Sequence, residues 1–170
     1  MTRKQDYARE RRERQHHKRD TLIEAATVAT LRDVDALSRG RKLTAQEVIE
    51  IAARHFKVTI LIIKGPSRRN TWARPYVPAR RIAMLLTYIY TRATIGRIAV
   101  AFRKDHTTFL CCRDAHLADL LELFLQHHAE AMERVNDGLR FRYEMNKKAQ
   151  ARLRRRRDMP VILTEATVAA

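Results

Sequence analysis

The sequence predicts an all-α fold in which a helix-turn-helix lies between long N- and C-terminal helices. Three observations predict it. Apolar residues, 45% of the chain, recur at helical spacing along most of its length, and only four glycines and four prolines interrupt 170 residues. A capping-box sequence begins at Thr44. Two short segments with helical periodicity meet at Asp105, a residue type that favours a helix N-cap.

The chain is strongly basic, with 35 Lys+Arg, 19 Asp+Glu and a formal net charge of +16. The excess is largest over residues 43–118, which hold 13 Lys+Arg and 4 Asp+Glu. A basic folded segment with few acids favours a polyanionic partner, whereas a merely basic, solvated surface is the alternative interpretation.

Several classes of protein and site are excluded by the sequence. No apolar run approaches the roughly 18 residues that span a bilayer. Charged residues begin at Arg3 and no apolar segment follows, which argues against a secretory signal and leads us to expect a cytoplasmic protein without membrane contact. The two cysteines, Cys111 and Cys112, are adjacent, and neither GxxxxGK[ST] nor GxGxxG occurs. We therefore expect no cofactor, no metal, no catalytic residues and no ATPase activity.

The N-terminal region is expected to be helical from Gln5 to about Leu37, because it lacks Gly and Pro. Residues 9–19 have almost no apolar face, so only the second half should pack on a core. Its apolar positions are Leu22, Ile23, Ala26, Val28, Ala29, Leu31, Val34 and Leu37. The segment 38–42 contains Gly40 and cations, which indicates a helix end. Residues 1–42 are interpreted as a basic helical extension.

The next elements begin the predicted helix-turn-helix domain, residues 43–126. Thr44 and Glu47 form the capping box of a helix. The β-branched run 59–63 fits either a strand or a buried turn of helix, and periodicity alone leaves both open. Residues 65–75 form a basic loop with Gly65, Pro66 and Pro75. Pro78 suits the first position of a helix that continues to about Tyr90.

Two consecutive helices then form the helix-turn-helix pattern. Thr94 can cap a short helix over 95–102, the pair Arg103–Lys104 makes a tight connection, and Asp105 caps the following helix. Beyond Gln126 we expect a basic helical extension over 127–158. An interruption is expected at Asn136–Gly138, and a basic cluster lies at 152–157. Pro160 should end it before a flexible tail, 159–170.

The stretch 77–117, and more loosely 43–117, resembles the C-terminal DNA-binding domain (domain IV) of the bacterial chromosomal replication initiator DnaA. Residues 79–84, Ala-Arg-Arg-Ile-Ala-Met, are similar to the PRQIAM element of that family. Residues 98–102, Ile-Ala-Val-Ala-Phe, and 104–108, Lys-Asp-His-Thr-Thr, are similar to its IGRAF and RDHTT elements. The resemblance implies a DnaA-type all-α fold and sequence-specific binding of double-stranded DNA.

The candidate base-contacting residues lie in the first turn of the second helix, the end that enters the major groove in a helix-turn-helix. They are Asp105, His106, Thr107 and Thr108. Short polar side chains can reach base edges, and a threonine methyl can contact a thymine methyl. Asp105 can act as a cap, as a base contact, or as both. The resemblance adds Arg80, which stands where the family inserts an arginine into the minor groove; a solvated surface cation is the alternative.

Phosphate contacts are expected from cations in the basic loop and around the two helices. They are Arg68, Arg69, Arg74, Arg97, Arg103, Lys104 and Arg113. Three departures from the family stand out: Ala99 replaces a usual Gly, Arg103 stands in a turn that usually contains Gly, and Phe109 replaces an aliphatic residue.

The sequence thus favours a free-standing, bacterial or phage DNA-binding protein in replication control or transcription regulation. Its partners would be double-stranded DNA and, indirectly through shared sites, the full-length initiator. The alternative is non-specific binding of DNA or RNA driven by the basic termini. A third interpretation makes the apolar residues Leu120, Leu121, Phe124 and Leu125 a protein-interaction seam, although their spacing fits core packing equally well.

Overall fold

The computed structural model describes residues 3–65 and 76–158, and these form an α-helical fold without a strand, which confirms the predicted fold class. The elements are α1 (Arg3–Ser38), α2 (Ala45–His55), α3 (Ile60–Lys64), α4 (Tyr76–Tyr90), α5 (Ile95–Ala101), α6 (His106–His127), a 3₁₀ turn η1 (Ala129–Ala131) and α7 (Met132–Asp158). The loop predicted at 65–75 falls, apart from Gly65, outside the described residues, as does the tail 159–170. None of the described helices combines the length and apolarity needed to cross a membrane.

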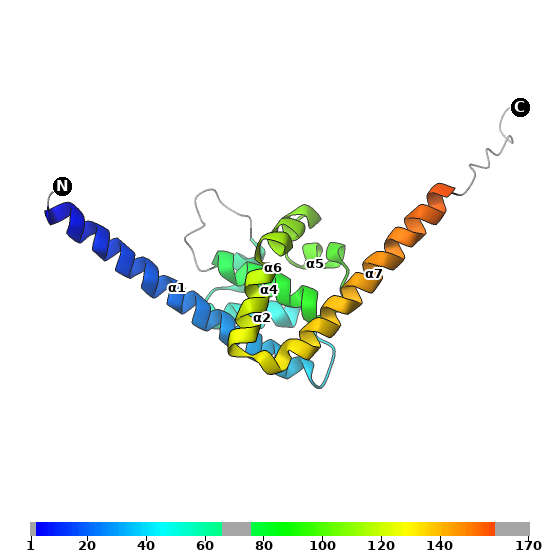
Figure 1. The fold of residues 1–170 in the computed structure, drawn as a ribbon, viewed down its shortest axis with the longest axis horizontal. Helices are drawn as coiled ribbons and strands as arrows, with labels where there is room; N and C mark the ends of the chain where they lie inside the picture. The colour runs from blue at the N-terminus through cyan, green and yellow to red at the C-terminus, as the bar shows by residue number, and fades with distance from the viewer. Residues whose placement is uncertain (1–2, 66–75, 159–170) are drawn as a thin grey trace, which may run out of the picture.

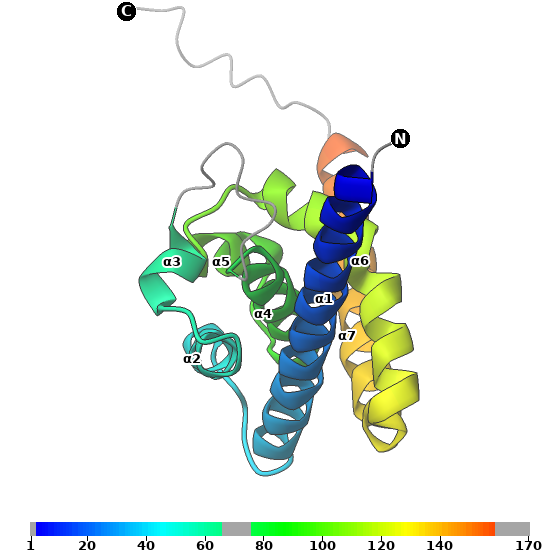
Figure 2. The same cartoon turned by 90° about the vertical axis from the view of Figure 1, so that its left-hand side faces the viewer.

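The helices surround α4, which packs against α1, α2, α6 and α7. The second half of α1 and the first half of α7 lie on the body of the molecule, and their distal halves project from it in diverging directions (Figure 1). Both views place these distal halves on the side of the molecule where α6 begins (Figures 1 and 2). The two long helices therefore frame the helix-turn-helix.

One apolar core joins every part of this body. Its largest fully buried side chains are Phe102, Phe109, Phe124, Leu31, Ile49, Ile63, Met84, Leu85, Leu86, Ile98, Leu120 and Val34. They come from α1 through α6, and Val135 of α7 is also fully buried. Leu120 and Phe124, two residues of the possible protein-interaction seam, thus pack in the core. Leu125 of the same seam is 58% exposed.

The helix starts predicted at Thr44 and Thr94 are confirmed by their hydrogen bonds, whereas α4 begins at Tyr76, two residues before the predicted start at Pro78. Glu47 N donates to Thr44 Oγ1 at 3.3 Å and Thr44 N donates to Glu47 Oε2 at 2.8 Å, which completes the capping box. Thr94 caps α5, since it accepts from Arg97 N at 3.3 Å. The run 59–63, for which strand and helix were both open, is helical from Ile60.

Helix α1 packs through its second half, as predicted, but two of its expected apolar positions lie outside the core. Leu31 and Val34 are fully buried, whereas Leu22 is 63% and Leu37 42% exposed. The buried face instead includes the polar residues Thr27, Thr30 and Asp35. Each threonine hydroxyl donates to the carbonyl four residues earlier, which satisfies its polar group inside the core.

The predicted interruption at Asn136–Gly138 is wrong, because α7 continues through it. Gly138 serves packing rather than a helix end: a Cβ at this position would lie 2.3 Å from the carbonyl oxygen of Ile89, so only glycine lets α7 approach α4 this closely. The chain instead breaks helix geometry at His128, with φ −156° and ψ 49°, where α6 ends and η1 begins.

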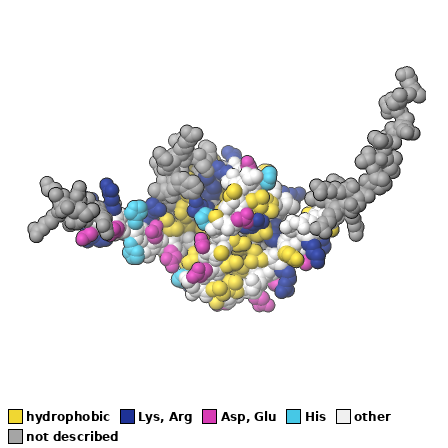
Figure 3. Space-filling model, turned by 45° about the horizontal axis from the view of Figure 1, so that its top comes forward, with side chains coloured by type: hydrophobic (Ala, Val, Ile, Leu, Met, Phe, Trp, Pro, Cys, Tyr) yellow, Lys and Arg dark blue, Asp and Glu magenta, His cyan; other side chains and the backbone are white. Residues whose placement is uncertain are grey.

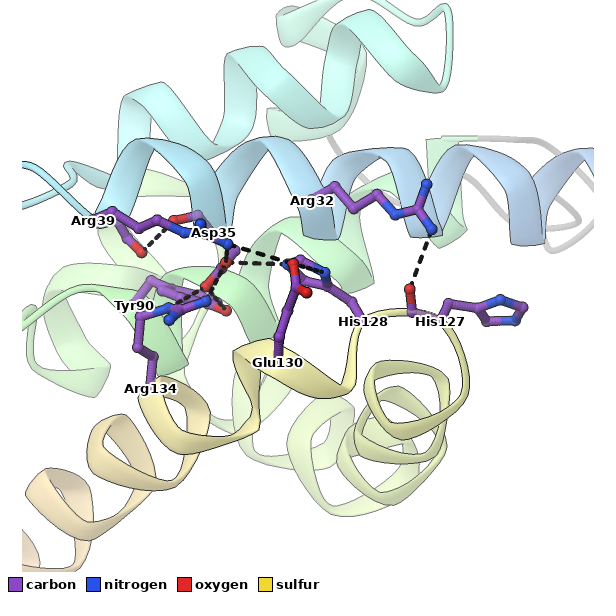
Figure 4. Close-up of polar contacts among 9 residues, drawn as sticks. Arg32, Asp35, Arg39, Tyr90, His127, His128, Glu130 and Arg134 are labelled. Atoms are coloured by element: carbon purple, nitrogen blue, oxygen red, sulfur yellow. Dashed lines mark hydrogen bonds and ion pairs between the residues drawn. The ribbon is translucent and has the colours of Figure 1, made fainter.

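A buried carboxylate fastens α1 to the α6–α7 corner (Figure 4). Asp35 has no exposed surface and accepts from Arg134 Nε at 2.7 Å, Arg39 Nη2 at 3.1 Å and Tyr90 OH at 3.1 Å; His128 Nε2 lies 3.0 Å from it. Burial alone would raise the pKa of Asp35, but the hydrogen bonds from Arg134, His128 and Arg39 outweigh it and hold this pKa below its ordinary value. The ionised carboxylate therefore fixes the root of α7 against α1.

Helix α7 has a second attachment at Arg142, which is 8% exposed. Its guanidinium donates to the carbonyls of Tyr88 at 2.7 Å, Ala93 at 2.5 Å and Thr91 at 2.6 Å. The same group lies 4.7 Å from the centre of the Tyr88 ring. These carbonyls belong to the end of α4 and the residues that follow, so Arg142 both satisfies a helix C-terminus and sets the direction of α7.

Candidate nucleic-acid interface

Helices α5 and α6 are joined by a tight turn that depends on a left-handed residue. Arg103 has φ 52°, and its amide donates to Val100 O at 3.0 Å while Lys104 N donates to Ala99 O at 2.9 Å. A non-glycine residue is strained in this region. The strain explains why DnaA-type sequences, in the resemblance given above, carry a Gly-containing turn where Arg103 stands.

The N-terminus of α6 is capped by Asp105, as the sequence predicts. Its Oδ1 accepts from Thr107 N at 2.7 Å and Thr108 N at 3.4 Å, and also from the Thr107 hydroxyl. The hydrogen bonds from the Thr107 side chain and amide lower the pKa of Asp105. One carboxylate oxygen is thus committed to the cap, and the Thr107 hydroxyl uses its hydrogen to donate to this oxygen. Asp105 Oδ2, and the oxygen and methyl of Thr107, are the parts that can meet a ligand.

The first turn of α6 presents its polar side chains to solvent from a rigid support. Asp105, His106, Thr107 and Thr108 are all exposed. Directly after them Phe109 is fully buried, and its ring lies 5.3 Å from that of Tyr88 of α4. Packing of this kind fixes the position of the first turn relative to α4.

A groove lies beside this turn, between α6 and the beginning of α4. Its lining residues are Val77, Arg80, Arg81, Met84, Thr107, Thr108, Cys111, Cys112, Ala115 and His116. Burial raises the pKa of the Cys112 thiol to about 11, so this thiol is neutral at physiological pH. Sequence reasoning did not single out Arg81 and Cys111 for this surface. Their positions in the sequence could have indicated them, because Arg81 follows Arg80 and Cys111 lies one helical turn after Thr107.

Arg80 is held by protein groups in this structure. It is 6% exposed, and its guanidinium donates to Ile63 O at 2.5 Å, Ile62 O at 3.1 Å and Gly65 O at 2.9 Å. Burial lowers the pKa of Arg80. The sequence did not predict this role, in which Arg80 caps the C-terminus of α3. Its contact with DNA bases stays a prediction and requires the guanidinium to leave these carbonyls.

The predicted phosphate-contacting cations fall into three groups. Arg97 on α5 and Arg103 in the turn are exposed. Lys104 donates to Gly65 O at 2.7 Å, and Arg113 pairs with Asp114 at 2.6 Å, so both are engaged with the protein. Arg68, Arg69 and Arg74 lie outside the described residues. In the described part of the chain, no cluster of three or more His, Cys, Asp or Glu side chains could hold a metal ion.

Basic side chains also gather away from the first turn. A pocket between the α1–α2 and α4–α5 connections includes Arg41, Lys42, Arg92 and Arg97 among its lining residues. Arg41 is paired with Glu47, and the Arg92 guanidinium lies 5.3 Å from the centre of the Phe141 ring. The face seen in Figure 3 shows Lys and Arg side chains on the upper part of the body, and an apolar surface bordered by Asp and Glu below it.

Comparison with known protein families gives one match. The family described as the bacterial DnaA protein helix-turn-helix matches residues 45–113, the stretch from α2 to the second turn of α6. No solved structure matches the chain. The matched stretch contains helix α2, the α5–α6 turn, the N-cap Asp105 and the exposed residues His106, Thr107 and Thr108 of the first turn of α6. Residues 45–113 are therefore a homologue of the DnaA C-terminal helix-turn-helix, a DNA-binding domain.

Proposed function

We propose that this protein binds double-stranded DNA sequence-specifically, at sites similar to DnaA boxes, in the control of replication initiation or of transcription. One observation carries the proposal: within the matched stretch, the first turn of α6 exposes four short polar side chains on a rigidly packed helix. Helices of this kind read base edges in the major groove through their N-terminal residues.

The contacts follow from the groups that remain available. His106 can donate to or accept from a base edge, and the methyl groups of Thr107 and Thr108 can contact thymine methyls. Asp105 keeps one oxygen that can accept from a cytosine amino group while the other caps the helix. None of these side chains is a lysine or an arginine, so they supply discrimination more than affinity.

Affinity would come from cations around this turn. Arg103 in the α5–α6 turn and Arg97 on α5 are exposed, and we propose both as phosphate contacts, together with Lys104, Arg113 and the loop residues Arg68, Arg69 and Arg74. We also propose that Arg80 reads the neighbouring minor groove, exchanging the carbonyls of α3 for base edges. The minor groove of A·T-rich DNA concentrates negative potential, which favours such a move.

The proposed mode of action needs no catalysis. Residues 43–126 would bind the box, and the protein would act by occupying sites that the full-length initiator also uses, without hydrolysing ATP. The segments 1–42 and 127–158 would be basic helical extensions of this domain. Action on the bacterial nucleoid follows from the proposed DNA target.

The test is a gel-shift titration with two duplexes, one that contains an initiator box and one with the box scrambled. We expect tighter binding of the box, and we expect His106→Ala and Thr107→Ala to remove the difference. Thr21→Ala is the matched control, because Thr21 is an exposed threonine on α1 and is not part of the first turn of α6. Equal affinity of the wild-type chain for both duplexes would defeat this proposal and favour non-specific binding.

A further inference from the structure

The two projecting helices differ in charge. Residues 3–20 of α1 hold 8 Lys+Arg and 4 Asp+Glu, and two of these cations pair with acids of the same helix, Arg14 with Glu10 and Arg19 with Asp20. Residues 140–158 of α7 hold 9 Lys+Arg and only 2 Asp+Glu. In Figure 3, Asp, Glu and His side chains mix with the cations along α1 at the left.

The direction of α7 is fixed by its contacts with the body. Arg134 holds its first turn to Asp35, Gly138 packs on the backbone of Ile89, and Arg142 donates to three carbonyls at and beyond the end of α4. These three attachments span more than two turns of the helix. The part of α7 that follows is therefore held at a set angle to α5 and α6.

This direction takes α7 past the beginning of α5. A groove is lined by Thr94, Ile95 and Gly96 on the α5 side and by Tyr143, Asn146 and Ala149 on the α7 side. In a helix-turn-helix the first helix crosses the DNA backbone while the second enters the groove. From Ala149, α7 continues to Asp158, about 13 Å further at 1.5 Å per residue, on the side where α6 begins (Figures 1 and 2).

The distal half of α7 has the surface of a polyanion-binding helix. Tyr143 and Met145 are exposed, and Lys147, Lys148 and Arg152 are exposed cations. Among the described residues, the chain beyond Ala149 does not contribute to the core. The base of this helix is fixed to the body, and its distal part is basic and buries no face in the core. Such a helix is suited to lie along a negatively charged surface.

We propose that residues 143–158 of α7 form a second DNA-contacting element, which lies along the phosphate backbone next to the bound site on the α5 side. Lys147, Lys148 and Arg152 are the contacting cations with described side chains. The contact reads no bases and lengthens the footprint on one side only. It adds affinity to the first turn of α6, which contains no lysine or arginine. The inference rests on the proposed function, because it takes α5 and α6 to be the DNA-binding helices.

The test compares two triple variants of the full chain that lose the same charge. One variant changes the α7 arm, residues 143–158, by Lys147→Gln, Lys148→Gln and Arg152→Gln. The other changes exposed positions of α1 by Arg11→Gln, Arg12→Gln and Lys18→Gln. Circular dichroism checks that both variants keep their helix content. The probes are a long duplex with a central initiator box, two duplexes cut short on one side of the box or on the other, and a scrambled long duplex.

We expect the α7 variant to lower the salt slope of log K on the long duplex by roughly 0.9 for each lost contact, so by about 2 to 3 in total. Its footprint should shorten on one side, and the duplex cut on that side should bind the variant and the wild type equally. The α1 variant should keep the wild-type slope and footprint.

Two outcomes separate this inference from the proposed function. If the box is discriminated but the two triple variants lose the same slope, the α7 arm is overturned and the proposed function stands. If box and scrambled duplexes bind equally, yet only the α7 variant loses slope and footprint, the proposed function fails and the arm is supported. A wild-type chain that binds no duplex overturns both.

Discussion

Two corners of the molecule each contain a buried arginine that donates to backbone carbonyls at the end of a helix. At the α3–α4 corner Arg80 donates to three carbonyls at the end of α3, and at the α4–α7 corner Arg142 donates to three carbonyls at and beyond the end of α4. Both guanidinium groups are almost fully buried. One lies in the groove beside the first turn of α6, and the other holds α7.

Both arginines bind protein carbonyls, so the presence of an arginine in a basic DNA-binding protein is not by itself evidence of a DNA contact. The backbone carbonyls at a helix C-terminus lack partners within the helix and carry partial negative charge, so they compete with phosphate for a guanidinium. Arg142 has the additional stacking on Tyr88, whereas Arg80 lines the groove beside the exposed first turn of α6. Stability and DNA binding should therefore respond differently to changes at the two corners.

The largest expected effect is at Arg142. Arg142→Ala removes three charged hydrogen bonds and the stacking on Tyr88, and leaves buried carbonyls without a donor, so the free energy of unfolding should fall by about 4 kcal/mol. Urea denaturation measures it. Discrimination between box and scrambled duplexes by the folded variant should be unchanged. A loss below about 1 kcal/mol would contradict the assigned role.

A substitution at Gly138 tests the close packing of α7 on α4 at the same corner. Gly138→Ala places a Cβ 2.3 Å from Ile89 O and should lower the free energy of unfolding by about 3 kcal/mol, because α7 must move away from α4. Gly96→Ala is the matched control within a helix. Nothing lies within 4 Å of its new Cβ, so it should gain about 0.5 to 1 kcal/mol of stability. Equal destabilisation by both substitutions would argue against the close approach.

Arg80 should show two effects where Arg142 shows one. Arg80→Ala leaves the carbonyls of Ile62, Ile63 and Gly65 without this donor and should lower the free energy of unfolding by about 2 kcal/mol. It should also weaken binding to the box more than binding to the scrambled duplex. Loss of stability with unchanged discrimination would reduce Arg80 to a helix-capping residue and remove the minor-groove contact.

The smallest expected effect is at the α5–α6 turn. Arg103 and Lys57 are the two described non-glycine residues with positive φ, at 52° and 53°. Arg103→Gly and Lys57→Gly each relieve strain and should raise the free energy of unfolding by up to about 1 kcal/mol in urea titrations. Both remove one positive charge, but only Arg103→Gly should lower the salt slope of DNA binding, by roughly 0.9. The same slope change in both variants would show that Arg103 makes no specific phosphate contact.

The structural features that could be predicted from the sequence alone are local ones. The caps at Thr44, Thr94 and Asp105 join groups no more than three residues apart, so residue type and spacing suffice to predict them. The helix-turn-helix and its four exposed residues follow from these caps and from the apolar spacing between them. The same reasoning left residues 59–63 open, because a short apolar run fits strand and helix equally.

The tertiary structure decided the roles that depend on distant partners. The carbonyls that hold Arg80 lie 15 to 18 residues away, and those that hold Arg142 lie 49 to 54 residues away. Asp35 meets Arg134 across 99 residues, and Gly138 matters only because of Ile89. An arginine, an aspartate or a glycine has the same local signal whether it faces solvent, DNA or a buried carbonyl. Which of these it meets is fixed only when the helices pack.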